Sequence, residues 1–113
     1  MSNMRCSSCL YEIFMSKGYW IVTTTVTNPE GFGEYVQGFA TWIESIGGKV
    51  AAKDLDAKTV EGKGGHLAVI IEFPSKELAS EAYNRADYQE LSKLRWANSS
   101  DTNITIMDGS VTH

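Results

Sequence analysis

Hydrophobic and polar residues alternate along the chain in patterns that predict four strands. Residues 19–27 (YWIVTTTVT) are rich in aromatic and β-branched types, as are residues 66–73 (HLAVIIEF), and both runs are typical of strands. Residues 49–54 (KVAAKD) show a weaker pattern of the same kind. The alternating ITIM within residues 101–108 predicts the last strand.

A longer hydrophobic period follows the first predicted strand. Across residues 32–46, apolar side chains recur at intervals of three and four positions, which gives a helix one hydrophobic face, and a glycine pair ends it. Two starts for this helix remain open. Thr27 and Glu30 can form a capping box, or Asn28 can cap the helix with Pro29 at its first position.

A second helical region follows the third strand. Ser75 is a good cap for a helix with apolar residues between positions 78 and 83. Residues 84–86 break this pattern. A second capping box, Asp87 with Glu90, then predicts a further helix before the last strand.

The resulting order, β-α-β-β-α-β, is the ferredoxin-like pattern, which predicts an α+β fold with one antiparallel sheet and helices on one side. The first strand carries large apolar groups on both faces, in a Tyr19/Ile21 set and a Trp20/Val22/Val26 set. Which set meets the helices remains open. Either choice leaves an apolar face that monomers rarely expose. We therefore expect a homodimer in which two sheets pack face to face.

Composition limits the class of protein. The chain has 113 residues, 42% of them hydrophobic, and a net charge of −4, which together indicate one small acidic domain. We expect no nucleic-acid partner and no membrane, because a basic patch and a long apolar span are both missing. We place the domain at residues 17–109, after an N-terminal tail or upstream start at 1–16 and before a short tail at 110–113. No secretory signal pattern is visible, so we expect a cytoplasmic protein.

Cys6 and Cys9 form a C-x-x-C pair in the expected N-terminal tail. A redox site of this type needs a preceding strand, and a zinc site needs two further ligands at suitable spacing. His66 and His113 do not have that spacing. We therefore expect reduced tail cysteines, no metal and no cofactor, and keep a redox or metal role as a weaker hypothesis.

Several short motifs, taken together in order and spacing, resemble one family, the domain-of-unknown-function family 1330 of the dimeric α+β barrel superfamily. They lie within residues 17–109: KGYWIV, Glu34-Tyr35, Gly47-Gly48, Val60-Glu61-Gly62, VIIEFPS, Ala82-Tyr83, Asp87-Tyr88-Gln89, Leu94-Arg95 and Asp108-Gly109. The resemblance implies a ferredoxin-like protomer in a homodimeric barrel, and it implies no particular reaction.

The sequence departs from the family pattern at two places. Lys53-Asp54 stands where relatives usually have arginine and glycine, and lysine lacks the planar fork of arginine. Residues 63–66 stand where relatives often have a tryptophan and an arginine. If those groups hold a ligand in relatives, we expect a different or weaker ligand here.

Glu72 is the main catalytic candidate. Its alternation with the bulkier residues of its strand predicts that it points away from the helices, toward the interior of a dimeric barrel. A carboxyl group desolvated there could serve as a general acid or base. The alternative is an ion pair with Lys53 or Arg95, or a place at the wet rim. His66 lies on the same face and is a weaker catalytic candidate.

A second group of residues could bind a ligand. Cationic and aromatic side chains are suited to hold an organic anion, although surface ion pairs or core packing explain the same residues. The candidates are Lys53, Arg95, Tyr35, Tyr83, Tyr88 and Trp20. Trp42 and Trp96 are expected to be packing residues.

These residues leave two functional hypotheses. The first is a small-molecule pocket, between the sheet and its helices or inside the barrel. The superfamily resemblance then implies cofactor-free proton transfer or oxygenation on a small organic compound, with Glu72 as acid or base, a tyrosine assisting, and Lys53 or Arg95 holding charge. The second is a non-catalytic interaction or stress-associated module that works through its dimer surface.

Overall fold

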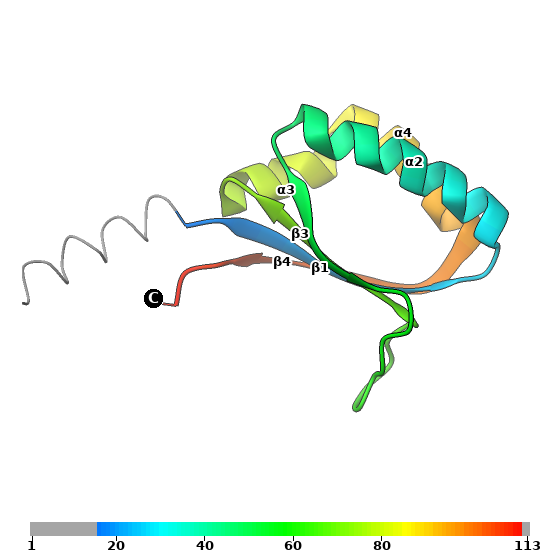
Figure 1. Ribbon diagram of the computed structural model, residues 1–113. Helices are drawn as coiled ribbons and strands as arrows, with labels where there is room; N and C mark the ends of the chain where they lie inside the picture. The colour runs from blue at the N-terminus through cyan, green and yellow to red at the C-terminus, as the bar shows by residue number, and fades with distance from the viewer. Residues whose placement is uncertain (1–15, 112–113) are drawn as a thin grey trace, which may run out of the picture.

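The computed structural model describes residues 16–111, and these form one sheet with helices along one side (Figure 1). The predictions about Cys6, Cys9, His113 and residues 1–15 of the N-terminal tail lie outside the described residues. In chain order the elements are β1 (Gly18–Val26), α2 (Pro29–Ser45), β2 (Lys49–Asp54), β3 (Leu67–Phe73), α3 (Lys76–Asn84), α4 (Ala86–Asn98) and β4 (Ser99–Asp108).

The four strands pair in the order β2-β3-β1-β4, and every pairing is antiparallel. All three helices lie on one face of this sheet, and the other face carries none of them (Figure 1). The predicted α+β, ferredoxin-like architecture is therefore confirmed, with its second helical region divided into α3 and α4.

Trp20 settles which side of β1 meets the helices. Its side chain is only 1% exposed, and its indole N–H donates to the Ala79 carbonyl of α3 at 2.8 Å. The rings of Phe73 and Tyr88 lie 5.1 Å from it, centroid to centroid. The hydrophobic core is thus an aromatic cluster between sheet and helices, comprising Trp20, Phe32, Tyr35, Trp42, Ile43, Leu67, Ile71, Phe73, Ala79, Ala82 and Tyr88.

None of the helices described for residues 16–111 covers the opposite face of the sheet. Register pairs Tyr19 with Glu72 and Ile21 with Ile70, and these side chains point away from the helices because they alternate with Trp20 and Ile71. We call the surface formed by these four residues and Met107 the open face; Met107, which pairs with Tyr19, is 44% exposed. The sheet therefore presents partly apolar groups with no helix over them.

The N-terminal caps of the helices include one correct prediction and one wrong one. α2 begins with Asn28 as N-cap and Pro29 at the first position, and in α3 the Ser75 hydroxyl accepts from a backbone N–H, as predicted. The predicted capping box at the start of α4 is wrong, because Arg85 is the N-cap and Asp87 lies inside the first turn. Hydrogen bonds from Arg85 lower the pKa of Asp87 to about 2.

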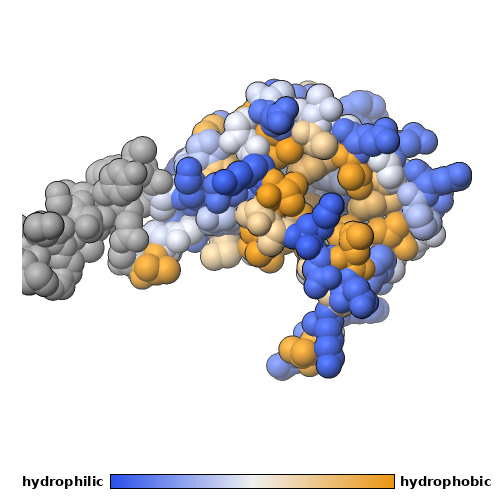
Figure 2. Space-filling view, viewed as in Figure 1, coloured by the Kyte–Doolittle hydropathy of each residue, from blue (hydrophilic) through white to orange (hydrophobic). Residues whose placement is uncertain are grey.

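Residues 55–66 connect β2 to β3 as an arm that projects beyond the sheet (Figure 1). Hydrophobic atoms reach the surface on this arm and at its base (Figure 2). Leu55 and Val60 contribute to this exposure, at 66% and 85%. The base of the arm is tight, since a Cβ built on Gly65 would overlap the Thr24 carbonyl of β1.

Replacing Gly65 with alanine should lower the free energy of unfolding by more than about 1 kcal/mol, because the new methyl group displaces β1 backbone. Gly33→Ala is the matched control. It lies inside α2 with no atom within 4 Å of the added Cβ, so it should raise the free energy of unfolding by about 0.5–1 kcal/mol. Urea denaturation measures both free energies of unfolding. If the Gly65→Ala protein is as stable as the parent, the close contact between Gly65 and the Thr24 carbonyl is contradicted.

Candidate functional site

Arg95 is a guanidinium held almost entirely away from water. It lies in the last turn of α4 and is 2% exposed. Its Nε donates to the Tyr88 hydroxyl at 3.4 Å, and that hydroxyl lies 2.8 Å from the hydroxyl of Tyr35. Its Nη1 is buried and has no hydrogen-bond partner.

No carboxylate of the described chain balances this charge. The ion pairs within residues 16–111 are Lys49–Glu72, Arg85–Asp87 and Lys93–Glu90, and none of them includes Arg95. The Trp96 ring lies 4.8 Å from the guanidinium carbon and provides a cation–π contact but no negative charge. A buried cation normally requires a paired anion, so Arg95 retains unused binding capacity.

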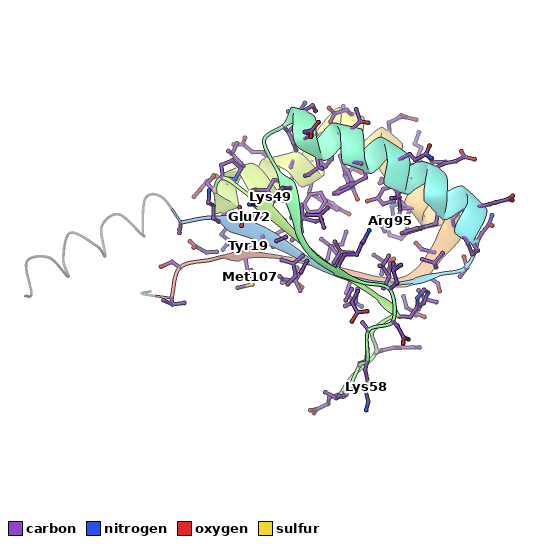
Figure 3. All side chains as sticks on the ribbon, viewed as in Figure 1. Tyr19, Lys49, Lys58, Glu72, Arg95 and Met107 are labelled. Carbon is purple, nitrogen blue, oxygen red and sulfur yellow. The ribbon has the colours of Figure 1, made fainter. Side chains whose placement is uncertain are left out.

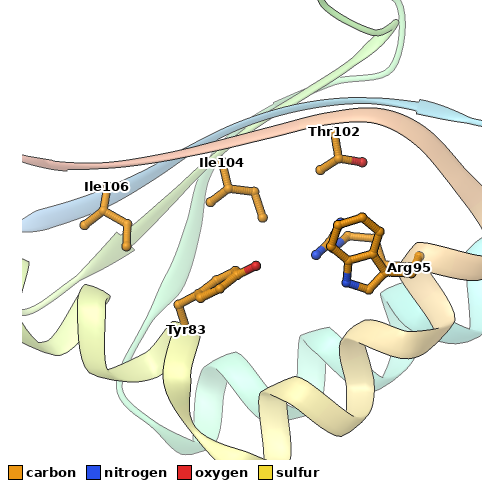
Figure 4. Close-up of a pocket in the computed structure, with 6 residues that line it drawn as sticks. Tyr83, Arg95, Thr102, Ile104 and Ile106 are labelled. Atoms are coloured by element: carbon orange, nitrogen blue, oxygen red, sulfur yellow. The ribbon is translucent and has the colours of Figure 1, made fainter.

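A cavity of about 270 Å³ lies against Arg95, between β4 and the helices α3 and α4 (Figure 4). Tyr83 points its hydroxyl toward Arg95 from α3, while three side chains of β4 face them across the cavity (Figure 4). The volume is slightly below the roughly 300–1,000 Å³ of typical ligand sites. The lining residues are Tyr83, Arg95, Trp96, Thr102, Ile104 and Ile106.

The β4 wall takes its shape from an irregularity in the strand. Register between β1 and β4 shifts between Thr23 and Thr25, and Asp101 adopts a positive φ of 54°. Beside this shift, the Thr102 hydroxyl lies 2.6 Å from the hydroxyl of the fully buried Thr24. The Thr102 hydroxyl at the cavity wall therefore lies next to this irregular stretch of β4.

The Tyr88 hydroxyl hydrogen-bonds to the Arg95 guanidinium and to the Tyr35 hydroxyl. Burial, and next the neighbouring Tyr88, raise the pKa of Tyr35 above its ordinary value, so this phenol stays protonated. Tyr88 is 0% exposed and lies between Tyr35 and Arg95. These two residues position Arg95, whereas Tyr83 lines the cavity itself.

Two other predicted ligand-binding residues lie elsewhere. Trp20 is packed into the aromatic cluster, and its N–H is already used by Ala79. Lys53 is exposed on β2, the edge strand opposite β4, and it does not line the cavity. The structure therefore brings together Arg95, Tyr83, Tyr88 and Tyr35. Trp20 packs against Tyr83 and Tyr88 without lining the cavity, and Lys53 lies away from it.

Glu72 points out of the open face, as its alternation predicted, together with Tyr19 (Figure 3). The Tyr19 hydroxyl donates to its carboxylate at 3.3 Å, and the Lys49 ammonium lies 3.7 Å away. Its ionic partner is therefore Lys49, and not Lys53 or Arg95, the two partners considered as an alternative to a catalytic role. The sheet separates Glu72 from Arg95, so one ligand within a protomer does not contact both.

His66 fixes the base of the arm. Its Nε2 accepts a hydrogen bond from the Val26 backbone N–H at 3.1 Å, and its Nδ1 lies 3.3 Å from the Leu55 carbonyl. The first contact requires an unprotonated Nε2, so the second is a donated Nδ1–H bond. Both ring nitrogens are occupied in holding two chain segments together.

Several lining residues were missed from the sequence. Trp96 was expected to pack, yet it is 65% exposed and forms a wall of the cavity. The alternation of Thr102, Ile104 and Ile106 was a visible signal, because it gives β4 a face toward the helices. The shift in register at Asp101, which accompanies Thr102 at the wall, has no comparable sequence signal.

Within residues 16–111, no three metal-ligating side chains lie close enough together to hold a metal ion. None of the helices described for this range is long and apolar enough to cross a bilayer. The chemistry available at the cavity is therefore that of a buried cation, hydroxyl groups and apolar surface.

Replacing Tyr88 with phenylalanine should lower the free energy of unfolding by about 1–3 kcal/mol, because Arg95 Nε and the Tyr35 hydroxyl lose their shared partner. Tyr83→Phe is the control. Its hydroxyl bonds to no other described residue, so its loss should change stability by less than about 0.5 kcal/mol. Equal effects in urea denaturation would show that Tyr88 does not carry this network.

Comparison with known proteins supports the fold and identifies the family. A Rhodopseudomonas palustris protein of unknown function superposes with a TM-score of 0.68 at 15% identity, over 96% of this chain and 95% of its own. A hypothetical Arabidopsis thaliana protein gives a TM-score of 0.63 at 12% identity, over 91% and 98%. No curated protein sequence matches. The model of a domain of unknown function, DUF1330, matches residues 17–110, and the chain therefore belongs to the DUF1330 family.

Proposed function

We propose that this protein binds a small organic anion in the cavity beside Arg95. The observation that carries the proposal is the buried guanidinium, which is 2% exposed and has an unpartnered Nη1 and no carboxylate partner among the described residues. A ligand carboxylate supplies both the charge and the hydrogen-bond acceptors that Arg95 lacks.

The remaining lining limits the size and character of the ligand. Ile104 and Ile106 offer apolar surface, and a cavity of about 270 Å³ suits a compact molecule. A short-chain or single-ring carboxylic acid fits these features. The Trp96 ring, 65% exposed, lines the cavity, and the guanidinium carbon of Arg95 lies over it, 4.8 Å from the ring centroid.

The cavity favours binding over the acid–base chemistry first considered. None of its lining residues is a carboxylic acid or a histidine. Glu72 is on the other face of the sheet and His66 anchors the arm. Proton transfer or oxygenation in this cavity would rest on Tyr83, the lining residue whose hydroxyl is not engaged with another described side chain.

We further propose that two copies pack through the open face. Tyr19, Ile21, Ile70 and Met107 place apolar surface there without a helix above it. A second copy covers this surface and removes it from water, with a gain of roughly 25 cal/mol per Å² of apolar area. The cavity at Arg95 lies on the helix side, so each copy of such a dimer keeps its own binding site.

Replacing Arg95 with methionine should weaken binding of butyrate or benzoate by at least about thirtyfold, because the charge partner of the carboxylate is removed. The same change should raise the free energy of unfolding of the ligand-free protein by about 1 kcal/mol or more, since an uncompensated buried charge is lost. Isothermal titration calorimetry and urea denaturation measure the two effects.

Glu72→Gln is the control for this experiment. It should leave the affinity unchanged, because Glu72 lies across the sheet from the cavity. Butyramide and benzamide, which lack the charge, should bind weakly to the parent. If no carboxylate binds the parent, or if Arg95→Met leaves affinity intact, the proposed function is wrong and the interaction module gains support.

Replacing Ile70 with lysine should convert a dimer into monomers, because it places a charge at the centre of the open face. Val36→Lys is the control, since Val36 is 45% exposed on α2, on the helix side. Sedimentation velocity gives the masses. A monomeric parent protein, or an Ile70→Lys dimer, contradicts the face-to-face assembly.

A further inference from the structure

We propose that the ligand of the Arg95 cavity is a hydroxylated carboxylic acid whose hydroxyl donates a hydrogen bond to Thr102. This inference rests on the proposed function and adds the chemical class of the ligand. It follows from the direction of the hydrogen bonds among three hydroxyl groups at the β4 wall, namely those of Thr24, Ser99 and Thr102.

Two of these three hydroxyl groups already have acceptors for their protons. The Thr24 hydroxyl lies 3.3 Å from the Ser100 carbonyl, and the Ser99 hydroxyl lies 2.5 Å from the Arg95 carbonyl. A carbonyl oxygen can only accept, and each hydroxyl has one proton to give. The arrangement that satisfies both carbonyls therefore uses the protons of Thr24 and Ser99.

In the arrangement that satisfies both carbonyls, Thr102 is the donor in its own contacts. Its hydroxyl lies 2.6 Å from Thr24 Oγ1 and 3.5 Å from Ser99 Oγ, and in this arrangement neither of those atoms has a proton left for it. The same arrangement directs the Thr102 proton into the wall, toward Thr24. The remaining lone pair of Thr102 Oγ1 is available to the cavity that this residue lines.

The surrounding backbone holds this orientation in place. Thr24 is 1% exposed, so water does not compete for its hydroxyl. The shift in β1–β4 register and the positive φ of Asp101 lie next to Thr102. Because threonine is β-branched, its side chain has few rotamers, and Oγ1 is a pre-oriented acceptor.

Arg95 and Thr102, the two polar sides of the cavity, therefore suit different groups of one ligand. Arg95 offers only donors and a positive charge, which suit a carboxylate, whereas Thr102 offers an acceptor, which suits a hydroxyl or an amine. A protonated amine would bring a second cation into a cavity that already contains the unpaired guanidinium, and the two charges would repel. A neutral hydroxyl donates to Thr102 without adding charge beside Arg95, and Ile104 and Ile106 offer apolar surface to the carbon skeleton.

The test compares acids that differ by one hydroxyl group: 3-hydroxybutyrate with butyrate, and 3-hydroxybenzoate with benzoate. Isothermal titration calorimetry on the full chain should show the hydroxylated acid of at least one pair binding about tenfold more tightly. The methyl ether 3-methoxybenzoate keeps the oxygen but has no proton to donate. It should therefore bind no more tightly than benzoate.

Two variants assign the preference to Thr102. Thr102→Val keeps the shape of the side chain and should remove the preference for each hydroxylated acid over its parent acid, measured as the ratio of the two affinities in the same variant. Thr102→Ser restores the acceptor and should retain the preference. Binding of the simple acids to each variant shows that it is folded with a working cavity.

The outcomes separate this inference from the proposed function. If butyrate and benzoate bind through Arg95 but hydroxylation gives no advantage, the inference is wrong and the proposed function stands. A preference that survives Thr102→Val, or a methyl ether that binds as tightly as the hydroxyl compound, also overturns the inference. If none of the acids binds the parent protein, both proposals fail together.

Discussion

A guanidinium without a counter-charge is the constraint on which the rest of this structure depends. Arg95 is 2% exposed, which costs free energy unless a partner restores the lost hydration. Two tyrosine hydroxyls and the Trp96 ring supply part of that compensation. The aromatic cluster around Trp20 supplies the packing that keeps the helices closed over the charge. The imbalance that remains is the observation behind the proposal of an anionic ligand.

The elements of the fold could be predicted because their signals are local. The strands show period-two alternation, and α2 shows a long apolar stripe ended by glycine. The predicted outward direction of Glu72 was also correct, since one strand's own alternation determines it. The error at the start of α4 has a simple origin. Asp87 has the composition of a cap, but its carboxylate instead pairs with Arg85, two residues before it.

The site was harder to predict because it depends on contacts between distant segments. Arg95 was a candidate from its charge, yet only the packing of α4 against the sheet shows that it is buried and lines a cavity. Its neighbour Trp96 has the composition of a core residue and lies outside the core. Thr102 reaches its partner Thr24 across 78 positions of sequence, beside a register shift that no local pattern marks. Lys53 and Arg95 looked equivalent as cations, but strand order places Lys53 at the opposite edge.

The sheet divides two kinds of chemistry between its faces. On the open face, Glu72 has a hydroxyl donor and an ammonium within 3.7 Å, so its charge is balanced within the chain. On the helix side, the guanidinium of Arg95 is not balanced by any described carboxylate. A balanced charge beside apolar groups can be covered by a protein surface at modest cost, whereas an unbalanced buried charge gains most from a small ion that fits its cavity. This difference supports the two proposals, assembly through the open face and ligand binding on the helix side, and under them one small domain would do both without competition between the two surfaces.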